Sequence, residues 1–282
     1  MAHILDGKAH AAVIKARIKE RIAGCQSPPS MAVVQVGSDP ASTIYIRHKR
    51  EACNEVGMGF RHVLLDEKIT QEAILAEVDA LNEDASIHGL LVQQPLPRHL
   101  DTEAVVDRIN PKKDVDCLHC YNIGLLSEGR SLMPSCTPAG IISLLKAYDI
   151  GLQGKHCVIV GRSRIVGKPL AMMMLNKSAT VTVCHSRTIG LADICRQADI
   201  LAVAIGQPKF VTADMVKEGC ILVDVGINRI SETSRKICGD VDYEGCVSKA
   251  SYITPVPGGV GPMTVAMLLE NCFKAWEQRA NS

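Results

Sequence analysis

The sequence predicts an α/β protein built from two parallel-sheet domains, the second of them Rossmann-like. Short apolar, β-branched runs alternate with segments of helical periodicity along most of the 282 residues. This alternation is typical of βαβ units, in which helices cover the faces of a parallel sheet. The alternating pattern starts twice, near residue 31 and near residue 156, and a chain of this length can bury two cores.

The first series of elements precedes residue 110. Apolar spacing predicts a helix over 14–22 that ends at Gly24, strands over 31–36, 60–65 and 89–93, and helices over 41–56, 71–81 and 101–109. Asp39 or Ser42 can cap the second helix. Residues 117–135 show no clear period, and we expect them to form a connecting loop.

The second series follows a helix that Thr137 and Pro138 open and that runs to about residue 148. Strands are expected over 156–160, 180–184, 200–205, 220–225 and 251–254, with helices between most of them. A proline- and glycine-rich loop over 254–262 then leads into a long closing helix over 263–279.

Composition excludes several classes of partner. The formal net charge is +1, with 31 basic and 30 acidic residues, so the chain has no basic footprint for nucleic acid or a membrane surface. No apolar run approaches the roughly 18 residues that a membrane span needs. The first residues carry charge and show no signal peptide, which predicts a cytoplasmic protein whose 12 cysteines are reduced and mostly buried.

A glycine turn follows the first strand of the second series. Residues 161–169 read GRSRIVGKP and lead into an apolar helix start. Such a junction directs backbone N–H groups and the positive end of a helix dipole at one point, where phosphate binds well. The spacing of Gly161 and Gly167 differs from the G-x-G-x-x-G fingerprint, so a turn without a ligand remains an alternative.

The next strand end bears on which dinucleotide is bound. An NAD site usually has a carboxylate about 20 residues after the turn, but residues 183–188 read VCHSRT and contain no acid. Ser186 and Arg187, together with Arg162, can hold a 2′-phosphate, which favours NADP over NAD. The alternative is a solvated polar strand end.

A second group of polar residues lies in the first half of the chain. Tyr45 and Lys49 are four residues apart and share one helical face. Lys49 can transfer a proton if burial or nearby cations lower its pKa; the alternative is an ordinary solvated lysine. Gln93, at the carboxyl end of a parallel strand, and Asp116, in the next loop, occupy positions where open α/β sheets place ligand contacts, whereas Asp114 suits a turn or cap equally well.

Cys117 and Cys120 form a C-x-x-C pair, a spacing used in zinc and redox sites. No second pair with matching spacing is present, and we expect no bound metal.

Six motifs occur in order along the chain, and together they are more specific than any one of them. They are YIRHK over 45–49, VQQPLP over 92–97, KDVD over 113–116, CTP over 136–138, GRSRIVGKP over 161–169 and PVPGGVGPMT over 255–264. In these motifs the chain resembles the bifunctional methylenetetrahydrofolate dehydrogenase/methenyltetrahydrofolate cyclohydrolase family, over essentially its whole length.

The resemblance implies roles for these residues. Lys49 matches the catalytic lysine, Gln93 its partner, Tyr45 the aromatic residue that stacks on the folate, and Asp116 the carboxylate that binds the pterin. Cofactor contacts are expected from Gly161, Arg162, Ser163, Ile165, Val166, Ser186, Arg187 and Ile227. Further substrate contacts are expected from Pro257, Gly258 and Gly259.

The resemblance also implies an architecture and a reaction. Residues 1–138 and 264–282 would form the catalytic domain, because the closing helix returns to it, and 139–263 the NADP domain, with a folate cleft between them. A hydride passes from 5,10-methylenetetrahydrofolate to NADP, and water opens the methenyl product to 10-formyltetrahydrofolate. Lys49, tuned by Gln93 and nearby positive charge, manages the proton. A homodimer and a place in purine biosynthesis are expected.

Two departures from the family pattern and three rival interpretations remain. Cys117 stands where the family commonly has glycine, and Gln94 where it commonly has leucine, so we expect altered tuning of folate binding.

The rival interpretations are an enzyme with one activity only, a non-catalytic NADP-binding scaffold, and a generic dehydrogenase of amino or hydroxy acids. The intact Lys49 and Gln93 argue against loss of hydrolysis, and the intact glycine turn argues against loss of the cofactor. A scaffold would have no reason to carry Tyr45, Lys49, Gln93 and Asp116, and a generic dehydrogenase would need a His–Asp pair or arginine clamp that is not obvious here.

Overall fold

A computed structural model describes residues 2–229 and 236–280 of the chain. The chain divides into two compact units. Unit 1 comprises Met1–Ala11, Leu126–Gly129 and Thr137–Thr264, and unit 2 comprises Ala12–Leu125, Arg130–Cys136 and Val265–Ser282. Each unit has its own parallel sheet.

Unit 2 contains a three-stranded sheet in the order β3-β2-β4. The strands are β2 (Ser30–Val36), β3 (Gly59–Leu65) and β4 (Gly89–Val92), and both neighbouring pairs are parallel. The helices wholly or largely in this unit are α1 (Gly7–Ile22), α2 (Pro40–Val56), α3 (Gln71–Glu83), α4 (Thr102–Arg108), α5 (Cys120–Ser127) and α10 (Val260–Ala280).

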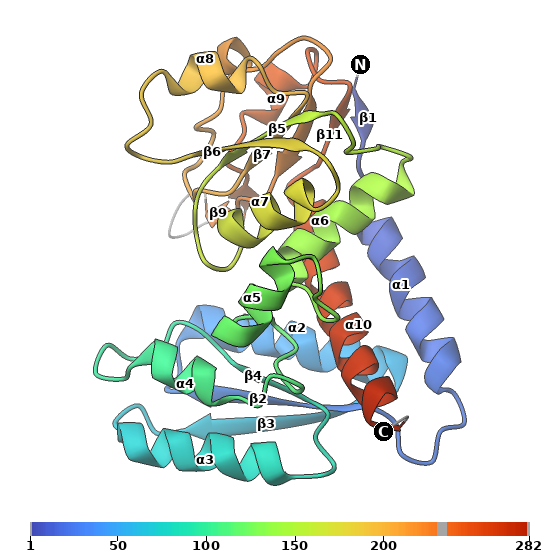
Figure 1. Ribbon diagram of the computed structural model, residues 1–282, viewed down its shortest axis with the longest axis vertical. Coiled ribbons are helices and arrows are strands. Elements are labelled where there is room, and N and C mark those ends of the chain that lie inside the picture. Colours follow the sequence, from blue (N-terminus) through green and yellow to red (C-terminus); the bar gives the residue numbers. More distant parts are fainter. Residues whose placement is uncertain (1, 230–235, 281–282) are drawn as a thin grey trace. The chain divides into compact units, whose positions relative to one another are not determined.

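One face of this sheet is covered by α3 and α4 (Figure 1). Side chains of β2 and β4 such as Val34 and Leu90 pack there against Ile74 and Val78 of α3, and all four are fully buried. Burying side chains of this size stabilises the fold by about 1.5–3 kcal/mol each. This apolar layer holds the carboxyl ends of β2 and β4 in place.

Unit 1 contains a six-stranded parallel sheet in the order β1-β11-β8-β7-β5-β6. Its strands are β1 (His3–Ile4), β5 (His156–Val160), β6 (Thr180–Cys184), β7 (Ile200–Val203), β8 (Ile221–Asp224) and β11 (Tyr252–Ile253). A separate antiparallel pair joins β9 (Asn228–Arg229) to β10 (Ile237–Cys238). The helices are α6 (Cys136–Ala147), α7 (Gly167–Leu175), α8 (Leu191–Cys195), η1 (Ala213–Met215) and α9 (Tyr243–Cys246).

The core strands β5, β7 and β8 are buried throughout or nearly so, because a parallel sheet is covered on both faces. On one face Val158, Leu201 and Leu222 pack with Cys195 of α8 and Cys246 of α9. The strand order places β5 between β6 and β7, which is the arrangement of a doubly wound nucleotide-binding sheet. The predicted α/β fold class with two parallel sheets is confirmed.

The sequence prediction missed three elements, and it placed the start of α1 at residue 14 although the helix begins at Gly7. Residues 117–135 contain α5, so the predicted continuous loop is wrong; α5 shows little amphipathic pattern, and its first N–H bonds to the distant Asp107. The short strand β1 and the β9–β10 pair were not predicted, since each is only two residues long.

The pairing of β1 also changes the expected domain assignment. Residues 1–11 were expected in the catalytic domain, but β1 pairs with β11 in unit 1. Two-residue strands have no periodicity of their own, so their place is decided by the strand that receives them. Residues 1 and 281–282, at the ends of the predicted domain ranges, lie outside the described residues.

The 12 cysteines lie within the described residues, and all of them are free. Nine are buried; Cys120 is exposed, and Cys25 and Cys238 are intermediate. Within residues 2–229 and 236–280, every helix is too short or too polar to span a lipid bilayer.

Candidate active site

The helix α2 positions the predicted Tyr45–Lys49 pair. Pro40 begins the helix, and the Asp39 carboxylate accepts the Ser42 N–H at 2.7 Å, so Asp39 and not Ser42 is the cap. Gly57 ends the helix at φ 86°, a left-handed conformation that glycine adopts without strain. The spacing then places Tyr45 and Lys49 on one face, with Tyr45 46% exposed.

Gln93 is the hydrogen-bond partner of Lys49. The Lys49 Nζ donates to Gln93 Oε1 at 2.9 Å. Gln93 follows the last residue of β4, and its backbone N–H bonds to Val34 O of β2 at 2.8 Å. The Gln93 amide nitrogen donates to the Gln94 carbonyl at 2.8 Å, which fixes the amide so that its oxygen faces the lysine. The predicted pairing of Lys49 with Gln93 is therefore present in the structure.

Burial lowers the pKa of Lys49 from its ordinary value. The neighbouring Asp116 opposes this shift, as Cys136 and Cys53 do more weakly. Of the two causes expected from the sequence, burial and nearby positive charge, burial is the one that lowers the pKa of Lys49, and the charged groups that act on it are acidic. A half-buried lysine with a lowered pKa can exist as the neutral amine, the form that accepts a proton.

The loop that carries Asp116 is held by its neighbours. The Lys113 carbonyl accepts the Leu90 N–H at 2.7 Å, which attaches the loop to β4. The buried Asp114 carboxylate accepts the N–H groups of Leu118 and His119 and the side-chain amide of Asn122. Asp114 is thus a turn carboxylate, and Asp116 remains the acid beside Lys49.

Cys117 occupies a strained position in the same loop. Its φ is 56°, in the left-handed region where a side chain costs about 1–2 kcal/mol, and the residue is fully buried. This conformation explains why glycine suits the position. Gln94, the second departure, contributes its backbone carbonyl to Gln93.

The sequence prediction missed Cys136, which acts on the pKa of Lys49, and Asn271, which contacts Cys136. Cys136 is buried, donates to the Val115 carbonyl at 3.3 Å, and keeps its proton because burial and Asp116 raise its pKa. Asn271 of α10 is fully buried and donates to the carbonyls of Val115 and Pro134, each at 2.8 Å. The CTP motif offered a signal for Cys136; for Asn271 the only signal was an amide within an apolar helix.

The predicted glycine turn lies in unit 1 between β5 and α7. Gly161 has φ 127°, and a Cβ there would lie 2.3 Å from the Ala204 carbonyl oxygen. A Cβ on Gly167 would lie 2.1 Å from the Gly161 oxygen. The Ser163 hydroxyl accepts the N–H of Val166 at 3.2 Å at the start of α7. Backbone atoms therefore pack against both glycines too closely for a side chain. The turn exposes its own backbone at the N-terminus of α7, where a phosphate group can bind.

Other predicted cofactor contacts lie at the same edge of the unit 1 sheet. Arg162, Ser163, Ser186 and Arg187 are exposed, Ile165 is 42% exposed and Ile227 is 48% exposed. Gly161 N–H bonds to Cys184 O at the end of β6, which ties the turn to the strand before Ser186 and Arg187. These residues follow β5, β6 and β8 at their carboxyl ends, where parallel sheets bind ligands.

The predicted substrate loop also lies in unit 1. The Gly258 carbonyl accepts the Lys8 N–H at 2.9 Å, and Gly259 N–H bonds to Pro255 O at 2.8 Å. A Cβ on Gly7 would lie 1.8 Å from Gly259 O, so the loop packs directly against the start of α1. Tyr45, Lys49, Gln93 and Asp116 belong to unit 2, whereas Pro257, Gly258, Gly259 and the cofactor turn belong to unit 1.

The C-x-x-C pair is not arranged as a site of its own. Cys117 is buried, whereas Cys120 is exposed at the start of α5. Potential ligand atoms of Asp107, His119 and Cys120 lie within 4.8 Å of one another. The Asp107 carboxylate already accepts the Cys120 N–H, however, and His119 Nδ1 accepts the Tyr121 N–H. These side chains cap the helix α5.

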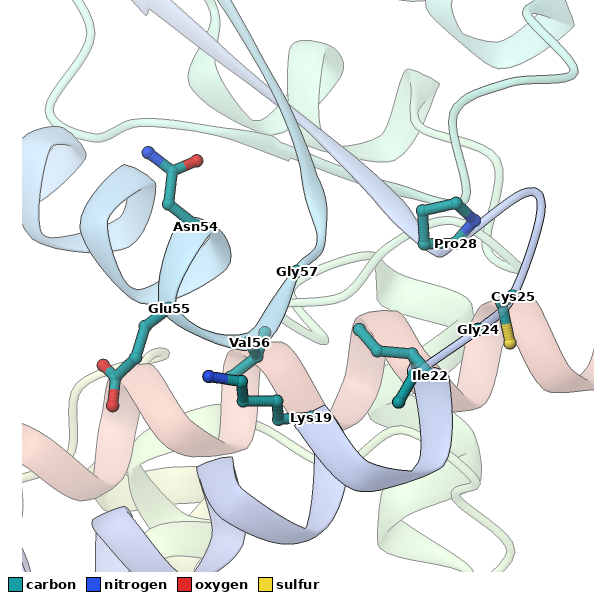
Figure 2. A pocket seen from close by; sticks show the side chains of 10 residues that line it. Lys19, Ile22, Gly24, Cys25, Pro28, Asn54, Glu55, Val56 and Gly57 are labelled. Atoms are coloured by element: carbon teal, nitrogen blue, oxygen red, sulfur yellow. The ribbon is translucent and has the colours of Figure 1, made fainter.

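A surface depression of about 340 Å³ lies elsewhere in unit 2, where α1 and α2 end (Figure 2). It is lined by Lys19, Ile22, Ala23, Gly24, Cys25, Pro28, Asn54, Glu55, Val56 and Gly57. None of these lining residues is among the predicted site residues, so the depression is separate from the Lys49 site.

Comparison with protein families decides between the interpretations. The tetrahydrofolate dehydrogenase/cyclohydrolase catalytic domain matches residues 5–116, and the NAD(P)-binding domain of the same family matches residues 135–280. The chain belongs to this family. A member named "Bifunctional protein FolD" from Agathobacter rectalis is 50% identical over 286 residues, which cover 99% of this chain and 100% of the relative.

Solved structures of tetrahydrofolate dehydrogenase/cyclohydrolases agree. The bifunctional FolD enzyme of Campylobacter jejuni is 49% identical, with a TM-score of 0.95 and coverage of 99% of this chain and 100% of that chain. The dehydrogenase-cyclohydrolase of Trypanosoma brucei, solved with NADP cofactor and an inhibitor, is 37% identical, with a TM-score of 0.95 and coverage of 100% and 99%.

The family membership confirms the predicted class of enzyme. The chain is a methylenetetrahydrofolate dehydrogenase and methenyltetrahydrofolate cyclohydrolase with an NAD(P)-binding domain. The scaffold and generic-dehydrogenase interpretations are therefore wrong. The roles of the individual residues stay predictions.

Proposed function

We propose that Lys49 is the proton-transfer group of the cyclohydrolase reaction and that Gln93 orients it. The observation that carries this proposal is the 2.9 Å hydrogen bond from Nζ to Gln93 Oε1, made by a lysine whose pKa burial lowers. Because Gln93 Oε1 accepts one N–H of the amine, the nitrogen lone pair is free to point elsewhere.

The hydrolysis requires two proton transfers at one place. Water adds to the methenyl carbon of the substrate, and the neutral Lys49 amine takes the proton that the water loses. The resulting ammonium returns a proton to the ring nitrogen whose bond to that carbon breaks. The new hydroxyl becomes the formyl oxygen as its proton leaves to solvent. Asp116 stabilises the transient ammonium, since it is the acid that raises the pKa of Lys49.

Substrate binding is proposed for both units. In unit 2 the exposed ring of Tyr45 offers an aromatic face for stacking, and Asp116 offers a carboxylate acceptor for pterin N–H groups. In unit 1 the loop of Pro257, Gly258 and Gly259 offers backbone groups, with Gly258 at φ 110°. The functional division, folate chemistry in unit 2 and cofactor binding in unit 1, is part of this proposal.

The residues of the glycine turn fit NADP. NADP, when bound, accepts the hydride from the methylene carbon of the substrate. Gly161 and Gly167 have no room for a Cβ, so the turn carries no side chains at these two positions. A pyrophosphate can therefore approach the backbone closely. We propose that Arg162, Ser163, Ser186 and Arg187 bind the cofactor phosphates. Apolar contacts with the cofactor are proposed for Ile165, Val166 and Ile227.

Cofactor choice tests this assignment. NADP should bind more tightly than NAD, and Arg162→Ala should reduce that preference while leaving NAD affinity nearly unchanged. Isothermal titration with each cofactor measures both values. A wild-type protein that binds NAD more tightly would contradict the assignment.

We further propose a cytoplasmic homodimer that serves purine biosynthesis. The strand β3 is an edge of the unit 2 sheet, and its Leu64 is 60% exposed, so it offers a surface for self-association. Sedimentation equilibrium should show a dimer, and Leu64→Lys should weaken it. A monomer at micromolar concentration would contradict the proposal.

The experiment that tests the overall proposal is a coupled assay. Methylenetetrahydrofolate and NADP are added to the enzyme, and NADPH, methenyl and 10-formyl products are followed together. We expect NADPH and the methenyl product to appear together, because one hydride transfer forms both, and the 10-formyl product to follow. Reduction of NADP without enzyme-dependent formation of 10-formyltetrahydrofolate would limit the enzyme to the dehydrogenase step.

A further inference from the structure

Two carboxylates are buried together in unit 1, at the carboxyl ends of β7 and β8. Asp224 is the last residue of β8 and is 3% exposed. Asp240 lies just after β10 and is fully buried. Buried acids are rare unless hydrogen-bonded, because desolvation of an unpaired charge is costly. The groups that these two carboxylates bind therefore indicate what they hold in place.

The Asp240 carboxylate binds the backbone that follows β7. Oδ2 accepts the N–H groups of Ile205 at 2.7 Å and Gly206 at 2.9 Å, and Oδ1 accepts that of Gln207 at 2.8 Å. Oδ1 also accepts the side-chain amide of Asn228 at 2.8 Å. One side chain thus joins the loop after β7 to the residue next to Ile227.

Asp224 holds Asp240 in turn. Its carboxylate accepts the N–H groups of Asp240 and Val241, each at 2.9 Å, and that of Gly226 at 3.0 Å. Close packing around the pair leaves no space for side chains. A Cβ on Gly226 would lie 2.2 Å from Asp240 Oδ1, and one on Gly239 would lie 1.7 Å from Asp224 Oδ2.

The strand order locates this pair relative to the proposed cofactor contacts. The order β6-β5-β7-β8 places the glycine turn after β5, with Ser186 and Arg187 after β6 on one side of it. A dinucleotide that binds across the point where the strand order reverses puts its 2′-phosphate end over β6 and its other half over β7 and β8. The loops that Asp240 binds follow β7 and β8.

We propose that Asp240, held by Asp224, is a positioning residue for the nicotinamide half of NADP. It fixes residues 205–207 and Asn228, and through them the surface around Ile227, without touching the 2′-phosphate end. This inference rests on the cofactor placement given under Proposed function. A carboxylate suits the role because it only accepts hydrogen bonds, and the groups that converge on it are donors. Burial raises the pKa of the supporting Asp224 to about 6.

Asp240→Asn is the test of the proposal. The variant keeps the shape but directs an NH₂ group at backbone N–H donors, so the loop after β7 should shift. We expect the Kd for NADP to rise by at least about tenfold, the effect of losing one charge-assisted hydrogen bond. Adenosine 2′,5′-bisphosphate carries the 2′-phosphate end without nicotinamide, and its Kd should stay within about twofold of wild type.

Asp242→Asn is the matched control. Asp242 belongs to the same segment, but its carboxylate pairs with the Lys209 side chain at 3.6 Å, whereas the backbone N–H groups of residues 205–207 bond to Asp240. This variant should bind both ligands as the wild type does. If Asp240→Asn does not fold, Asn228→Ala removes only one donor to Asp240 and should raise the Kd for NADP by a smaller factor, again with no change for the bisphosphate.

The outcomes separate this inference from the cofactor placement. Equal weakening of NADP and bisphosphate by Asp240→Asn, or no weakening of either, would overturn the positioning role. The placement itself is tested by Arg162→Ala, which should weaken the bisphosphate. If Arg162→Ala leaves bisphosphate binding unchanged, the placement fails whatever the Asp240 variant does.

Discussion

Replacing Lys49 by arginine should separate the two activities. Arginine remains charged at every accessible pH, whereas burial lowers the pKa of Lys49 toward the range in which a neutral amine exists. Arginine still offers an N–H to Gln93 Oε1, so the variant loses the proton acceptor and keeps a donor at this position. A positioned general base contributes about 10²–10⁴-fold, or about 3–5 kcal/mol of activation free energy.

We therefore expect Lys49→Arg to lower the rate of methenyltetrahydrofolate hydrolysis by about 10²–10⁴-fold. The hydride step needs alignment rather than proton transfer, so NADP reduction with methylenetetrahydrofolate should fall far less. Both rates are measured spectrophotometrically on the same preparation, after circular dichroism has shown that the variant folds. Arg47→Lys, an exposed position on the same helix, is the control and should leave both rates unchanged.

A Lys49→Arg enzyme that hydrolyses methenyltetrahydrofolate at the wild-type rate would refute the reasoning. Equal loss of both activities would instead assign Lys49 to substrate binding, because a proton-transfer role predicts an unequal loss.

Three further predictions concern the surroundings of the site. Because Cys117 has φ 56°, Cys117→Gly should be more stable than Cys117→Ala by about 1 kcal/mol in urea unfolding; equal stability would contradict backbone strain. Burial raises the pKa of Asp224 from 3.8 to about 6, so folding favours its protonated form. Wild type should thus lose roughly 3 kcal/mol relative to Asp224→Asn as pH rises from about 4 to about 6, and a constant difference in unfolding free energy would count against this. Asp107 and His119 are already engaged in capping α5, so dialysis against a chelator should leave both activities unchanged, and recovery on adding a metal would show that one is needed.

Local patterns were sufficient to predict most of the fold. The apolar runs at 31–36, 156–160 and 180–184 became β2, β5 and β6 within a residue of their expected limits, because a buried parallel strand needs a continuous apolar run. The closing helix was likewise predicted, although it starts three residues earlier, at Val260. Elements of two residues, and α5 with its distant cap, have no such local signal.

For the site, the sequence by itself determined which residues lie on one helical face and where glycines are required. Tyr45 and Lys49 are related by helix geometry alone, and Gly161 and Gly167 are needed wherever backbone segments approach too closely for a Cβ. Six ordered motifs also determined the family. These features depend on neighbours along the chain, so they can be recognised without the fold.

Only the tertiary structure decided the partners of Lys49 and the direction of its pKa shift. Gln93 is 44 residues away in sequence, and Asn271 is 156 residues from the Val115 carbonyl that it binds. The sequence left burial and nearby cations open as causes of a lowered pKa for Lys49, but in the fold its acidic neighbours Asp116, Cys136 and Cys53 raise the pKa and burial lowers it. Desolvation depends on how the elements pack around an atom, and no local pattern of residues contains that information.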